Sequence, residues 1–402
     1  MPCACFAGLS RNVVLLAVAS LFTDISTEML YPVLPVFLTQ MLGASGSILG
    51  LMDGCAQATQ NIAQGLSGTL SDRVRKRKTI ALVGYLLAAF SKPLMGLSTG
   101  WMDLFGARML DRLGTGTRSA PRDALIASSV GEKDRGRAFG FEGAGDNAGA
   151  FFGPLLAAFL LSLSQIGIRS IFYLALIPGL LAFCMVLFVK ENQEAVATRS
   201  RLGAGPEQFP VIYWKYLLVT ALFGIGGSSN AFLILRTRDA GVSLATTILI
   251  YSAFNLVAAL VSYPAGYLSD QWGRRALLLV SFIVFLIAYL GFAVSRNIML
   301  TAGLFVVYGV YQGIARSVGK ALAADLVPTD LRATGIGWYS ATTGLLQLVA
   351  SVIAGELWDR VGHAAVFYNG AIFAVTGIIG LLILLPKGTG NGQALSVRRY
   401  RG

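Results

Sequence analysis

Long apolar stretches alternate with short polar ones along the whole chain. A helix needs about 20 residues to cross a bilayer, and twelve of the stretches reach that length. They lie at 12–39, 46–70, 79–99, 102–127, 138–163, 169–189, 213–235, 243–268, 276–295, 298–324, 334–357 and 364–386. Most connections between them are too short to hold a soluble domain. The pattern predicts an all-α polytopic membrane protein with twelve transmembrane helices.

The longest polar interval runs from Lys190 to Pro210 and separates the first six segments from the last six. Its glycine, proline and charge content is typical of a solvated linker. We therefore expect an N-terminal six-helix bundle over 1–189, a cytoplasmic linker over 190–212, and a C-terminal six-helix bundle with a short tail over 213–402.

Basic residues are distributed unevenly between the two sides of the predicted membrane. If the N-terminus is cytoplasmic, that side holds Arg73, Arg75, Lys76, Arg77, Lys78, Lys133, Arg135, Arg137, Lys190, Arg199, Arg201, Arg274 and Arg275. The opposite loops hold only Arg169, Arg236, Arg238, Arg296 and Arg360. Positive charge collects on the cytoplasmic side of membrane proteins. We expect both termini in the cytoplasm and a multi-pass protein of the cell inner (cytoplasmic) membrane.

The composition agrees with a membrane protein and narrows its partners. Hydrophobic residues make up 55% of the chain and charged residues only 13%. The net charge of +12 is explained by basic loops that face anionic lipid. No basic and aromatic surface for nucleic acid is visible. The four cysteines lack the spacing of a zinc site or a disulfide framework, and we expect neither a metal nor a cofactor.

The first segment carries two carboxylates at membrane depth. Asp24 and Glu28 are four residues apart, so a helix places them one above the other on a single face, with Tyr31 near that face. An ionised carboxylate there costs at least a few kcal/mol. The two acids must face a wet cavity, find cationic partners or hold protons. We expect at least one of them to be functional; a salt-bridged structural pair is the alternative.

Similar stretches recur at the same places in the two halves. Residues 68–77 (GTLSDRVRKR) follow the second segment, and residues 266–275 (GYLSDQWGRR) follow the eighth. Residues 123–127 (DALIA) correspond in the same way to residues 320–324 (KALAA). Each helix has the same orientation as its counterpart, so the pattern indicates a parallel duplication of six helices.

At these stretches the chain resembles the major facilitator superfamily, over essentially its whole length. Residues 266–275 match that superfamily's Gly-x-Leu-Ala-Asp-Arg-x-Gly-Arg-Arg signature, found between its second and third helices and repeated between the eighth and ninth. The first copy departs from the signature, with Arg75 where the second glycine is expected. The resemblance implies a secondary transporter whose two six-helix bundles rock about a central site.

The two loop copies are predicted to form a conformational latch. Glycines at 68 and 266 allow close helix approach, and the two aspartates can cap a helix end or pair with arginine. The resemblance implies that Asp72 engages the cytoplasmic start of the eleventh helix in the outward-open state. The predicted latch residues are Gly68, Asp72, Arg73, Arg77, Gly266, Asp270, Gly273 and Arg274.

The fourth segment carries many charges, so it must be surrounded by protein or water. Arg112-x-x-x-Gly116 resembles the superfamily's fourth-helix motif Arg-x-x-Gln-Gly, with Thr115 in place of Gln. The resemblance implies that Arg112 faces the cavity and tunes the protonation of a nearby acid. Helical rise places Arg112 about 14 Å from the outer end, near the depth of Glu28. Glu28 is therefore the favoured proton carrier, and Asp24 is its partner or a substrate contact.

Three further cations are predicted to be structural. Arg118 and Arg122 lie nearer the cytoplasmic surface, where they can snorkel or pair with Asp123. Lys92, in the third segment, lies at a depth comparable to that of Asp53. Because the third helix is peripheral in the resembled superfamily, we predict a structural Asp53–Lys92 pair.

Spaced glycines in the fifth segment predict close helix packing. Gly149-x-x-x-Gly153-Pro154 also resembles the fifth-helix motif of the superfamily's antiporters, although Ala157 and Ala158 replace its last two glycines. The resemblance favours export over uptake.

The second half has fewer charges at its centre. Its counterpart of the acidic stretch has Ile225 at the position of Asp24 and Ser229 at the position of Glu28, which confines coupling charge to the first half. Polar residues that could line the substrate cavity are Tyr31, Asp146, Asn147, Asn230, Asn255, Tyr311, Gln312, Arg316, Tyr339 and Gln347. These side chains do not decide between an anionic, zwitterionic or cationic solute.

The predicted function is proton-coupled secondary transport, with H⁺ antiport of a drug or metabolite favoured over uptake of a small metabolite, siderophore or metal. The expected partners are a small solute, protons and lipid, and the expected functional unit is a monomer. An ATP-driven pump is disfavoured because no phosphate-binding Gly-x-x-x-x-Gly-Lys-Ser/Thr loop is present. A membrane enzyme is the alternative from another class, disfavoured because no catalytic motif such as His-Glu-x-x-His is present.

Overall fold

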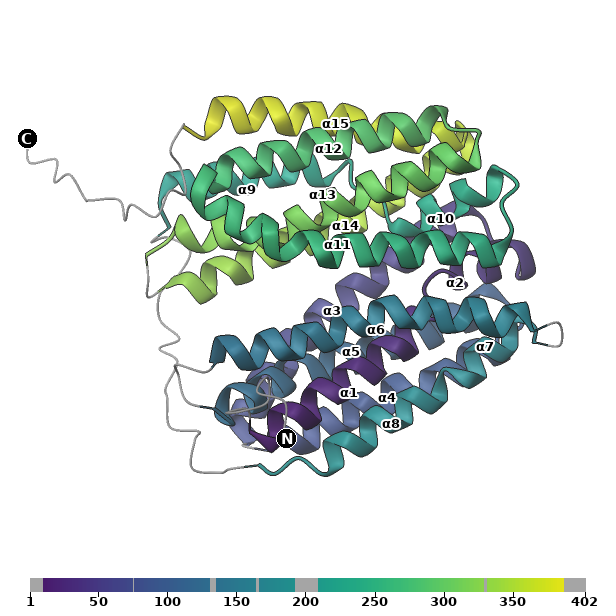
Figure 1. The fold of residues 1–402 in the computed structure, drawn as a ribbon, viewed down its shortest axis with the longest axis vertical. Helices are drawn as coiled ribbons and strands as arrows, with labels where there is room; N and C mark the ends of the chain where they lie inside the picture. Colours follow the sequence, from purple (N-terminus) through teal and green to yellow (C-terminus); the bar gives the residue numbers. More distant parts are fainter. Residues whose placement is uncertain are drawn as a thin grey trace, which may run out of the picture. The chain divides into compact units, whose positions relative to one another are not determined.

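A computed structural model describes residues 10–74, 76–130, 135–163, 166–191, 209–328 and 331–386, and every predicted segment is helical in it (Figure 1). The first half contains α1 (Arg11–Glu28), α2 (Leu34–Val36), the π-helix η2 (Phe37–Met41), α3 (Gly46–Val74), α4 (Arg77–Leu97), α5 (Trp101–Ser128), α6 (Arg135–Ser162), α7 (Ile168–Leu174) and α8 (Leu176–Leu187). The second half contains α9 (Val211–Gly224), α10 (Asn230–Asp239), α11 (Leu244–Trp272), α12 (Arg274–Val294), α13 (Ile298–Asp325), α14 (Arg332–Arg360) and α15 (His363–Leu384). The predicted all-α polytopic fold is confirmed.

Helix lengths repeat between the two halves. α3 and α11 each have 29 residues, α4 and α12 each have 21, and α5 and α13 each have 28. The first helix of each half is also interrupted, between Glu28 and Leu34 in one and between Gly224 and Asn230 in the other. The first interruption contains Pro32, which cannot donate a helical hydrogen bond. The agreement supports the duplication predicted from the sequence.

Eight helical spans in the described part of the chain are long and apolar enough to cross a membrane. They come from α4, α6, α7–α8, α11, α12, α13, α14 and α15. The remaining described helices are α2, η2 and α9, which are short, and α1, α3, α5 and α10, which carry more polar sequence. Polar groups are costly in lipid, so these helices need protein or water beside them.

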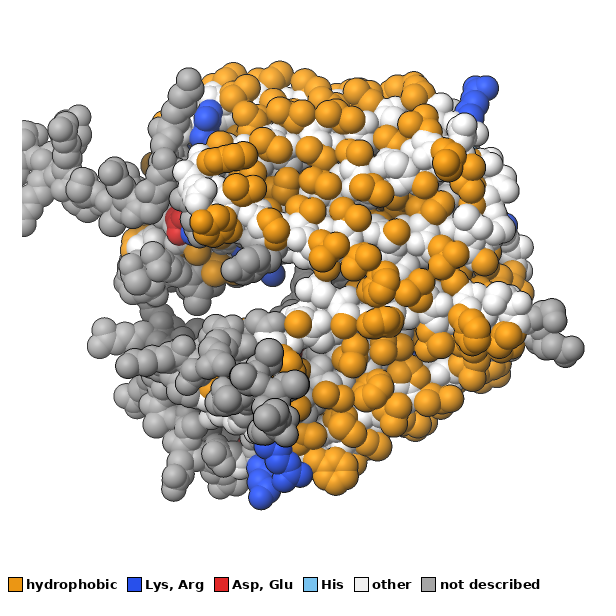
Figure 2. Space-filling view, in the orientation of Figure 1, with side chains coloured by type: hydrophobic (Ala, Val, Ile, Leu, Met, Phe, Trp, Pro, Cys, Tyr) orange, Lys and Arg blue, Asp and Glu red, His pale blue; other side chains and the backbone are white. Residues whose placement is uncertain are grey.

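Large hydrophobic side chains are exposed on the outer faces of several helices. Ile283 and Ile287 on α12 and Ile372, Ile379 and Ile383 on α15 are examples. Figure 2 shows hydrophobic side chains spread over the visible face with few charged ones among them. An apolar surface of this extent suits contact with lipid tails rather than with water.

Two compact units divide the chain. Unit 1 contains Met1–Ser200, Ser229–Leu256 and Ser351–Asp359; unit 2 contains Arg201–Ser228, Val257–Ala350 and Arg360–Gly402. Helix α10, the beginning of α11 and the end of α14 are therefore grouped with the helices of the first half. The boundaries 1–189, 190–212 and 213–402 remain a prediction, and residues 192–208 of the predicted linker lie outside the described residues.

Glycines bring α5 into backbone contact with α3 and α4. A Cβ atom on Gly84 of α4 would lie 2.7 Å from the carbonyl oxygen of Gly114 on α5. A Cβ atom on Gly116 would lie 2.3 Å from the carbonyl oxygen of Gln60 on α3. Only glycine fits at such distances, and this close packing holds the charges of α5 inside unit 1.

Candidate functional site

Both acids of α1 lie beside a row of glycines on α6. A Cβ atom on Gly149 would lie 2.6 Å from the Cβ atom of Asp24. A Cβ atom on Gly153 would lie 3.1 Å from the Cβ atom of Glu28. Gly145, one turn earlier, approaches the carbonyl oxygen of Ala17 in the same way. The close packing predicted for this segment is present, and it fixes the helix face that carries the acids.

Asp24 lies close to a network of charges built around Arg122. One guanidinium nitrogen of Arg122 lies 2.8 Å from the Glu142 carboxylate and 3.9 Å from that of Asp146. A second lies 2.9 Å from Asp123. The Ser20 hydroxyl donates a 2.8 Å hydrogen bond to Glu142. Asp24 interacts electrostatically with Asp146 and Arg122, so it belongs to the same network of charges.

Arg118 is buried instead of reaching the membrane surface. Its residue exposure is 4%, and its guanidinium carbon lies 4.9 Å from the centre of the Tyr85 ring. Its Nε and Nη1 atoms have no hydrogen-bond partner among the described residues. The snorkelling predicted for Arg118 is wrong, because the close packing of α5 on α4 keeps the side chain inside. Arg122 does pair with Asp123, as predicted, and also with Glu142.

A second network is centred on Asp111, whose side chain is fully buried. Its carboxylate lies 2.5 Å from Lys92 Nζ, 3.2 Å from Arg108 Nη1 and 2.8 Å from Arg112 Nη2. Ser91 donates a longer hydrogen bond of 3.4 Å to the same carboxylate. One acid therefore serves three cations, which leaves an excess of two positive charges on this group.

Lys92 does not pair with the acid predicted for it. The structure pairs it with Asp111 on α5, and a 3.3 Å hydrogen bond joins it to Thr27. Asp53 instead accepts a hydrogen bond from the Ser229 hydroxyl. The predicted Asp53–Lys92 pair is thus corrected to Lys92–Asp111, because glycine contacts draw α4 against α5 rather than against α3.

Arg112 also interacts with acids other than Asp111, and its predicted role depends on such interactions. Its Nη1 atom donates a 3.0 Å hydrogen bond to the side-chain oxygen of Gln60. It interacts electrostatically with Glu28 and Asp53 besides Asp111. With Glu28 and Asp53 ionised, these three acids balance the three cations around Asp111.

Glu28 ends α1 and contacts Tyr251 of α11. The Tyr251 hydroxyl donates a 3.4 Å hydrogen bond to its carboxylate. Tyr31 stacks on the Tyr251 ring, with 5.4 Å between the ring centres and 15° between the planes. Glu28 thus lies between the cation network and a tyrosine from the other half of the sequence, all within unit 1.

The beginning of α3 is joined to the end of α14 by Asp359. Its carboxylate accepts hydrogen bonds from the backbone nitrogens of Gly46 at 2.8 Å and Ser47 at 2.7 Å, and from the Ser47 hydroxyl at 2.5 Å. The first N–H groups of a helix have no partner within it, and a carboxylate there also interacts favourably with the helix dipole. This contact, also within unit 1, was not predicted from the sequence.

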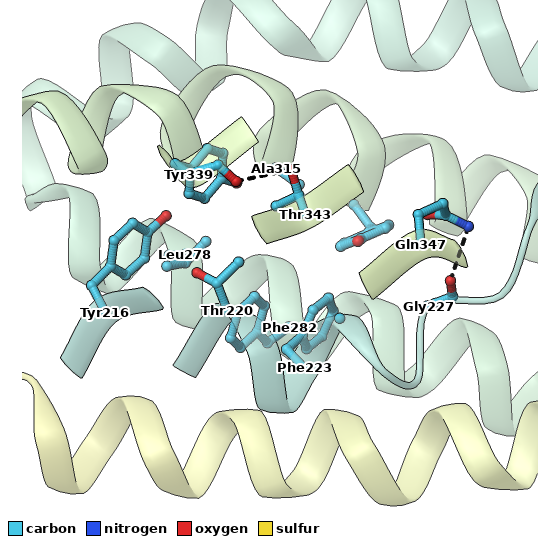
Figure 3. Close-up of a pocket in the computed structure, with 12 residues that line it drawn as sticks. Tyr216, Thr220, Phe223, Gly227, Leu278, Phe282, Ala315, Tyr339, Thr343 and Gln347 are labelled. Carbon is cyan, nitrogen blue, oxygen red and sulfur yellow. Dashed lines mark hydrogen bonds between the residues drawn. The ribbon is translucent and has the colours of Figure 1, made fainter. Parts of the chain in front are cut away.

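Unit 2 contains a cavity of about 150 Å³ (Figure 3). Its lining residues come from α9, α12, α13 and α14 and from the interruption after α9: Tyr216, Thr220, Phe223, Gly224, Gly227, Leu278, Phe282, Tyr311, Ala315, Tyr339, Thr343 and Gln347. Figure 3 shows Tyr339, Thr343 and Gln347 in a row along α14. Three of the residues predicted to line a substrate cavity, Tyr311, Tyr339 and Gln347, lie in this lining.

The other predicted cavity residues lie elsewhere. Asp146 is half-buried beside Arg122, and Asn147 is exposed. The Asn255 side chain donates a 3.2 Å hydrogen bond to the carbonyl oxygen of Ala150. Asn230 is the first residue of α10. Gln312 is half-buried but does not line the unit 2 cavity, and the Arg316 side chain lies outside the described residues.

Only part of the predicted latch falls on described side chains. Gly68 packs near Ala120 of α5, whereas no described atom lies within 4 Å of a Cβ atom at Gly266, so the predicted close approach is absent there. Gly273 has φ +90°, which favours glycine, and precedes Arg274, which pairs with Asp325. The backbone nitrogen of Arg77 donates a 2.7 Å hydrogen bond to the Glu191 carboxylate. The side chains of Asp72, Arg73 and Asp270 lie outside the described residues.

Comparisons with known proteins agree with this arrangement. The family model of the Major Facilitator Superfamily matches residues 16–236 and 216–399. The chain belongs to the major facilitator superfamily. It is 36% identical to an MFS-type transporter of Methanocaldococcus jannaschii over 384 residues, which cover 94% of this chain and 95% of the relative. It is 23% identical to the quinolone resistance protein NorA of Staphylococcus aureus over 363 residues, or 88% and 91% of the two chains.

A solved structure shows the same fold. The nucleoside transporter NupG (D323A mutant) matches with a TM-score of 0.77 at 12% identity, over 94% of this chain and 100% of that chain. Because the family model and the 36% identical relative place it in the major facilitator superfamily, the protein is a multi-pass membrane transporter and not an enzyme. The resemblance inferred from the loop signature is confirmed.

Several residues of the site escaped prediction. Asp111 precedes Arg112, and a buried cation cluster requires an acid, so the spacing Arg108, Asp111, Arg112 was an available signal. The lining residues Tyr216, Thr220 and Phe223 recur at helical spacing on α9. Tyr339, Thr343 and Gln347 do the same on α14. Glu142 and Asp359 gave no such signal, because their partners lie far away in the sequence.

Proposed function

We propose that this transporter is proton-coupled, with Glu28 as the proton carrier. The proposal rests on two interactions of Glu28, one with a network of cations and one with a neutral tyrosine hydroxyl. On one side is the cation network, through its interaction with Arg112. On the other is the hydroxyl of Tyr251, at 3.4 Å. Protonation of Glu28 changes both interactions at once.

Charge balance gives the physical reason. Lys92, Arg108 and Arg112 bring three positive charges, and Asp111 neutralises one of them. The network is neutral only when Glu28 and Asp53 are both ionised. A proton on Glu28 leaves one uncompensated cation at membrane depth, which weakens the attraction between α1 and Arg112. Proton binding can therefore bias a structural change in unit 1.

Asp24 is assigned a second role near the other network. It interacts electrostatically with Asp146, Arg118, Glu28 and Arg122. Among the described residues, three more acids, Asp123, Glu142 and Asp146, lie within 4 Å of Arg122. Asp24 is thus the partner of Glu28 or a contact of a cationic solute.

Export is the favoured direction, and the cell inner membrane with both termini in the cytoplasm is the favoured location. The α6 glycine row that resembles the antiporter motif supports export by packing against both acids. The relative NorA is named for quinolone resistance, in keeping with efflux. Uptake of a small metabolite by the same coupling is the second candidate, because the acids do not fix the sign of coupling.

The proposal is tested in two steps. A thermal-shift screen of the purified transporter against metabolites, drugs and siderophores finds a solute, because a ligand of the native state raises stability. Proteoliposomes are then assayed for pH-gradient-driven accumulation and for counterflow of that solute. Glu28→Gln should abolish the accumulation and retain counterflow. If Glu28→Gln retains gradient-driven accumulation, the assignment of Glu28 is wrong, and if Asp24→Asn retains it as well, neither acid of α1 couples transport to protons.

A further inference from the structure

The cavity of unit 2 is lined largely by aromatic rings. Phe223 stacks on Phe282, with 3.8 Å between ring centres and 6° between planes. Tyr216 stacks on Tyr339, with 5.8 Å and 4°. Tyr311 adds a fifth ring, tilted against Phe223 at 6.0 Å. These rings belong to four different helices, so the packing of unit 2 holds their faces in fixed positions.

The polar groups of this lining are few and uncharged. Thr220, Thr343 and Gln347 are its other polar side chains, and no described lining residue carries a formal charge. Gln347 donates a 3.2 Å hydrogen bond to the carbonyl oxygen of Gly227, and Thr343 donates to the backbone of Tyr339. The Tyr311 side chain lines the cavity, and no hydrogen bond joins its hydroxyl to a described residue, so the hydroxyl is available to a bound molecule.

We propose that this cavity binds a planar aromatic ring system without negative charge, and that a hydrogen-bond acceptor on a neutral ring system strengthens its binding. The inference rests on the proposed transport function and names the chemical class of its solute. The fixed ring faces favour a flat ligand. The Tyr311 hydroxyl can donate a hydrogen bond to an acceptor atom on that ligand.

Size and electrostatics both favour this class. A cavity of about 150 Å³ is the size of an apolar protein cavity that holds a benzene-sized ring, and because this cavity opens to solvent, a second fused ring can extend out of it. The face of an aromatic ring carries partial negative charge, so it attracts cations and repels anions. Neutral and cationic aromatic solutes are therefore accepted, and carboxylates are rejected.

Binding of four simple probes tests the proposal on the full-length protein in lipid nanodiscs, with no pH gradient, by isothermal titration calorimetry. Coumarin has two fused rings and a carbonyl acceptor. Valerolactone keeps the lactone and lacks the aromatic ring. N-methylquinolinium keeps two aromatic rings and lacks an acceptor. 2-Naphthoate carries a negative charge. Coumarin and N-methylquinolinium should bind, and valerolactone and 2-naphthoate should bind at least 10-fold more weakly.

Three variants separate the ring contacts from the hydrogen bond. Tyr311→Phe should weaken coumarin about 2- to 10-fold, the usual contribution of one hydrogen bond, and leave N-methylquinolinium unchanged. Phe282→Leu should weaken both by about 3- to 10-fold, because it removes one stacked ring. Tyr308→Phe is the matched control: Tyr308 is on the same helix as Tyr311 but does not line the cavity, so both affinities should be unchanged.

Some outcomes overturn the proposal. The proposal is overturned if 2-naphthoate binds more tightly than coumarin, or if valerolactone and coumarin bind equally well. Unchanged affinities in Phe282→Leu overturn it as well, provided that this variant retains the unliganded melting temperature of Tyr308→Phe. Because no gradient is applied, failure here is distinct from failure of proton coupling. If proton coupling through Glu28 is wrong but the binding proposal is right, Glu28→Gln keeps gradient-driven transport and the aromatic probes still bind.

Discussion

Asp111→Asn removes the one acid that contacts three cations. The wild-type carboxylate is fully buried and lies within 3.2 Å of Lys92, Arg108 and Arg112. Asparagine has nearly the same shape and keeps one oxygen, so the substitution creates no cavity. It changes only the charge, and leaves Lys92, Arg108 and Arg112 with no acid in direct contact among the described residues.

The expected cost follows from the burial of the partners. Lys92 is 1% exposed and Arg108 is 4% exposed, so solvent cannot replace the lost carboxylate. Removal of one partner from a buried ion pair costs about 3–5 kcal/mol. Such a loss lowers the melting temperature by roughly 5–15 °C. Lys92→Met in the same chain removes one of the uncompensated cations, so the double variant should lose less stability than the sum of the single variants.

Thermal unfolding in detergent, followed by size-exclusion chromatography of the remaining folded protein, measures the effect. Asp123→Asn is the matched control, because it makes the same change on the same helix at a side chain that is 42% exposed. Exposed pairs contribute about 0–1 kcal/mol, so this variant should melt within about 2 °C of wild type. Equal melting temperatures for Asp111→Asn and Asp123→Asn would refute the argument that Asp111 neutralises a buried cation network.

Two further substitutions test the helix contacts. Gly149→Ala places a Cβ atom 2.6 Å from that of Asp24 and should destabilise the protein by about 1–3 kcal/mol. Gly143→Ala, on the same helix with no described atom within 4 Å, should be neutral or slightly stabilising; equal melting temperatures for the two would contradict the close packing. Asp359→Ala removes the cap of α3 and should cost about 0.5–2 kcal/mol and speed maleimide labelling of Cys55 on α3. Asp359→Asn, which keeps a capping oxygen, should change labelling less, and identical labelling of Asp359→Ala and wild type would argue against the cap.

The sequence predicted the features that depend on local pattern. Apolar length gave the twelve helical segments, and the repeated loop signature gave the duplication that the helix lengths support. The four-residue spacing of Asp24 and Glu28 placed both on one face of α1. The spaced glycines of α6 predicted close packing, and the structure supplies the surface they meet, which is that same acidic face.

Partners across helices could not be predicted in the same way. Depth in the membrane suggested Asp53 as the partner of Lys92, but depth does not say which helices touch, and Asp111 on α5 is the actual partner. The contact of Gly84 with Gly114 decides between them, because it presses α4 against α5. Arg118 was misjudged for the same reason: a position near a helix end predicts snorkelling only where the side chain faces lipid.

The two copies of the loop signature also show that equivalent glycines in a repeat can differ in their packing. Gly68 and Gly266 occupy equivalent positions in the repeat, yet only Gly68 approaches another helix closely. The residue type permits a close approach but does not require one. The Asp359 cap shows the opposite limit, since a carboxylate more than 300 positions away from the helix that it caps leaves no local pattern.

The most direct test of the central claim is the movement of protons with the solute through Glu28. Proteoliposomes hold a trapped pH-sensitive dye, and valinomycin with equal potassium on both sides fixes the membrane potential. An outward gradient of the solute found in the screen is then applied. Wild-type antiport should acidify the lumen as solute leaves, and Glu28→Gln should carry the solute in counterflow with no change of pH. Solute movement by the wild type with no change of pH, or the same acidification in Glu28→Gln, would contradict the account.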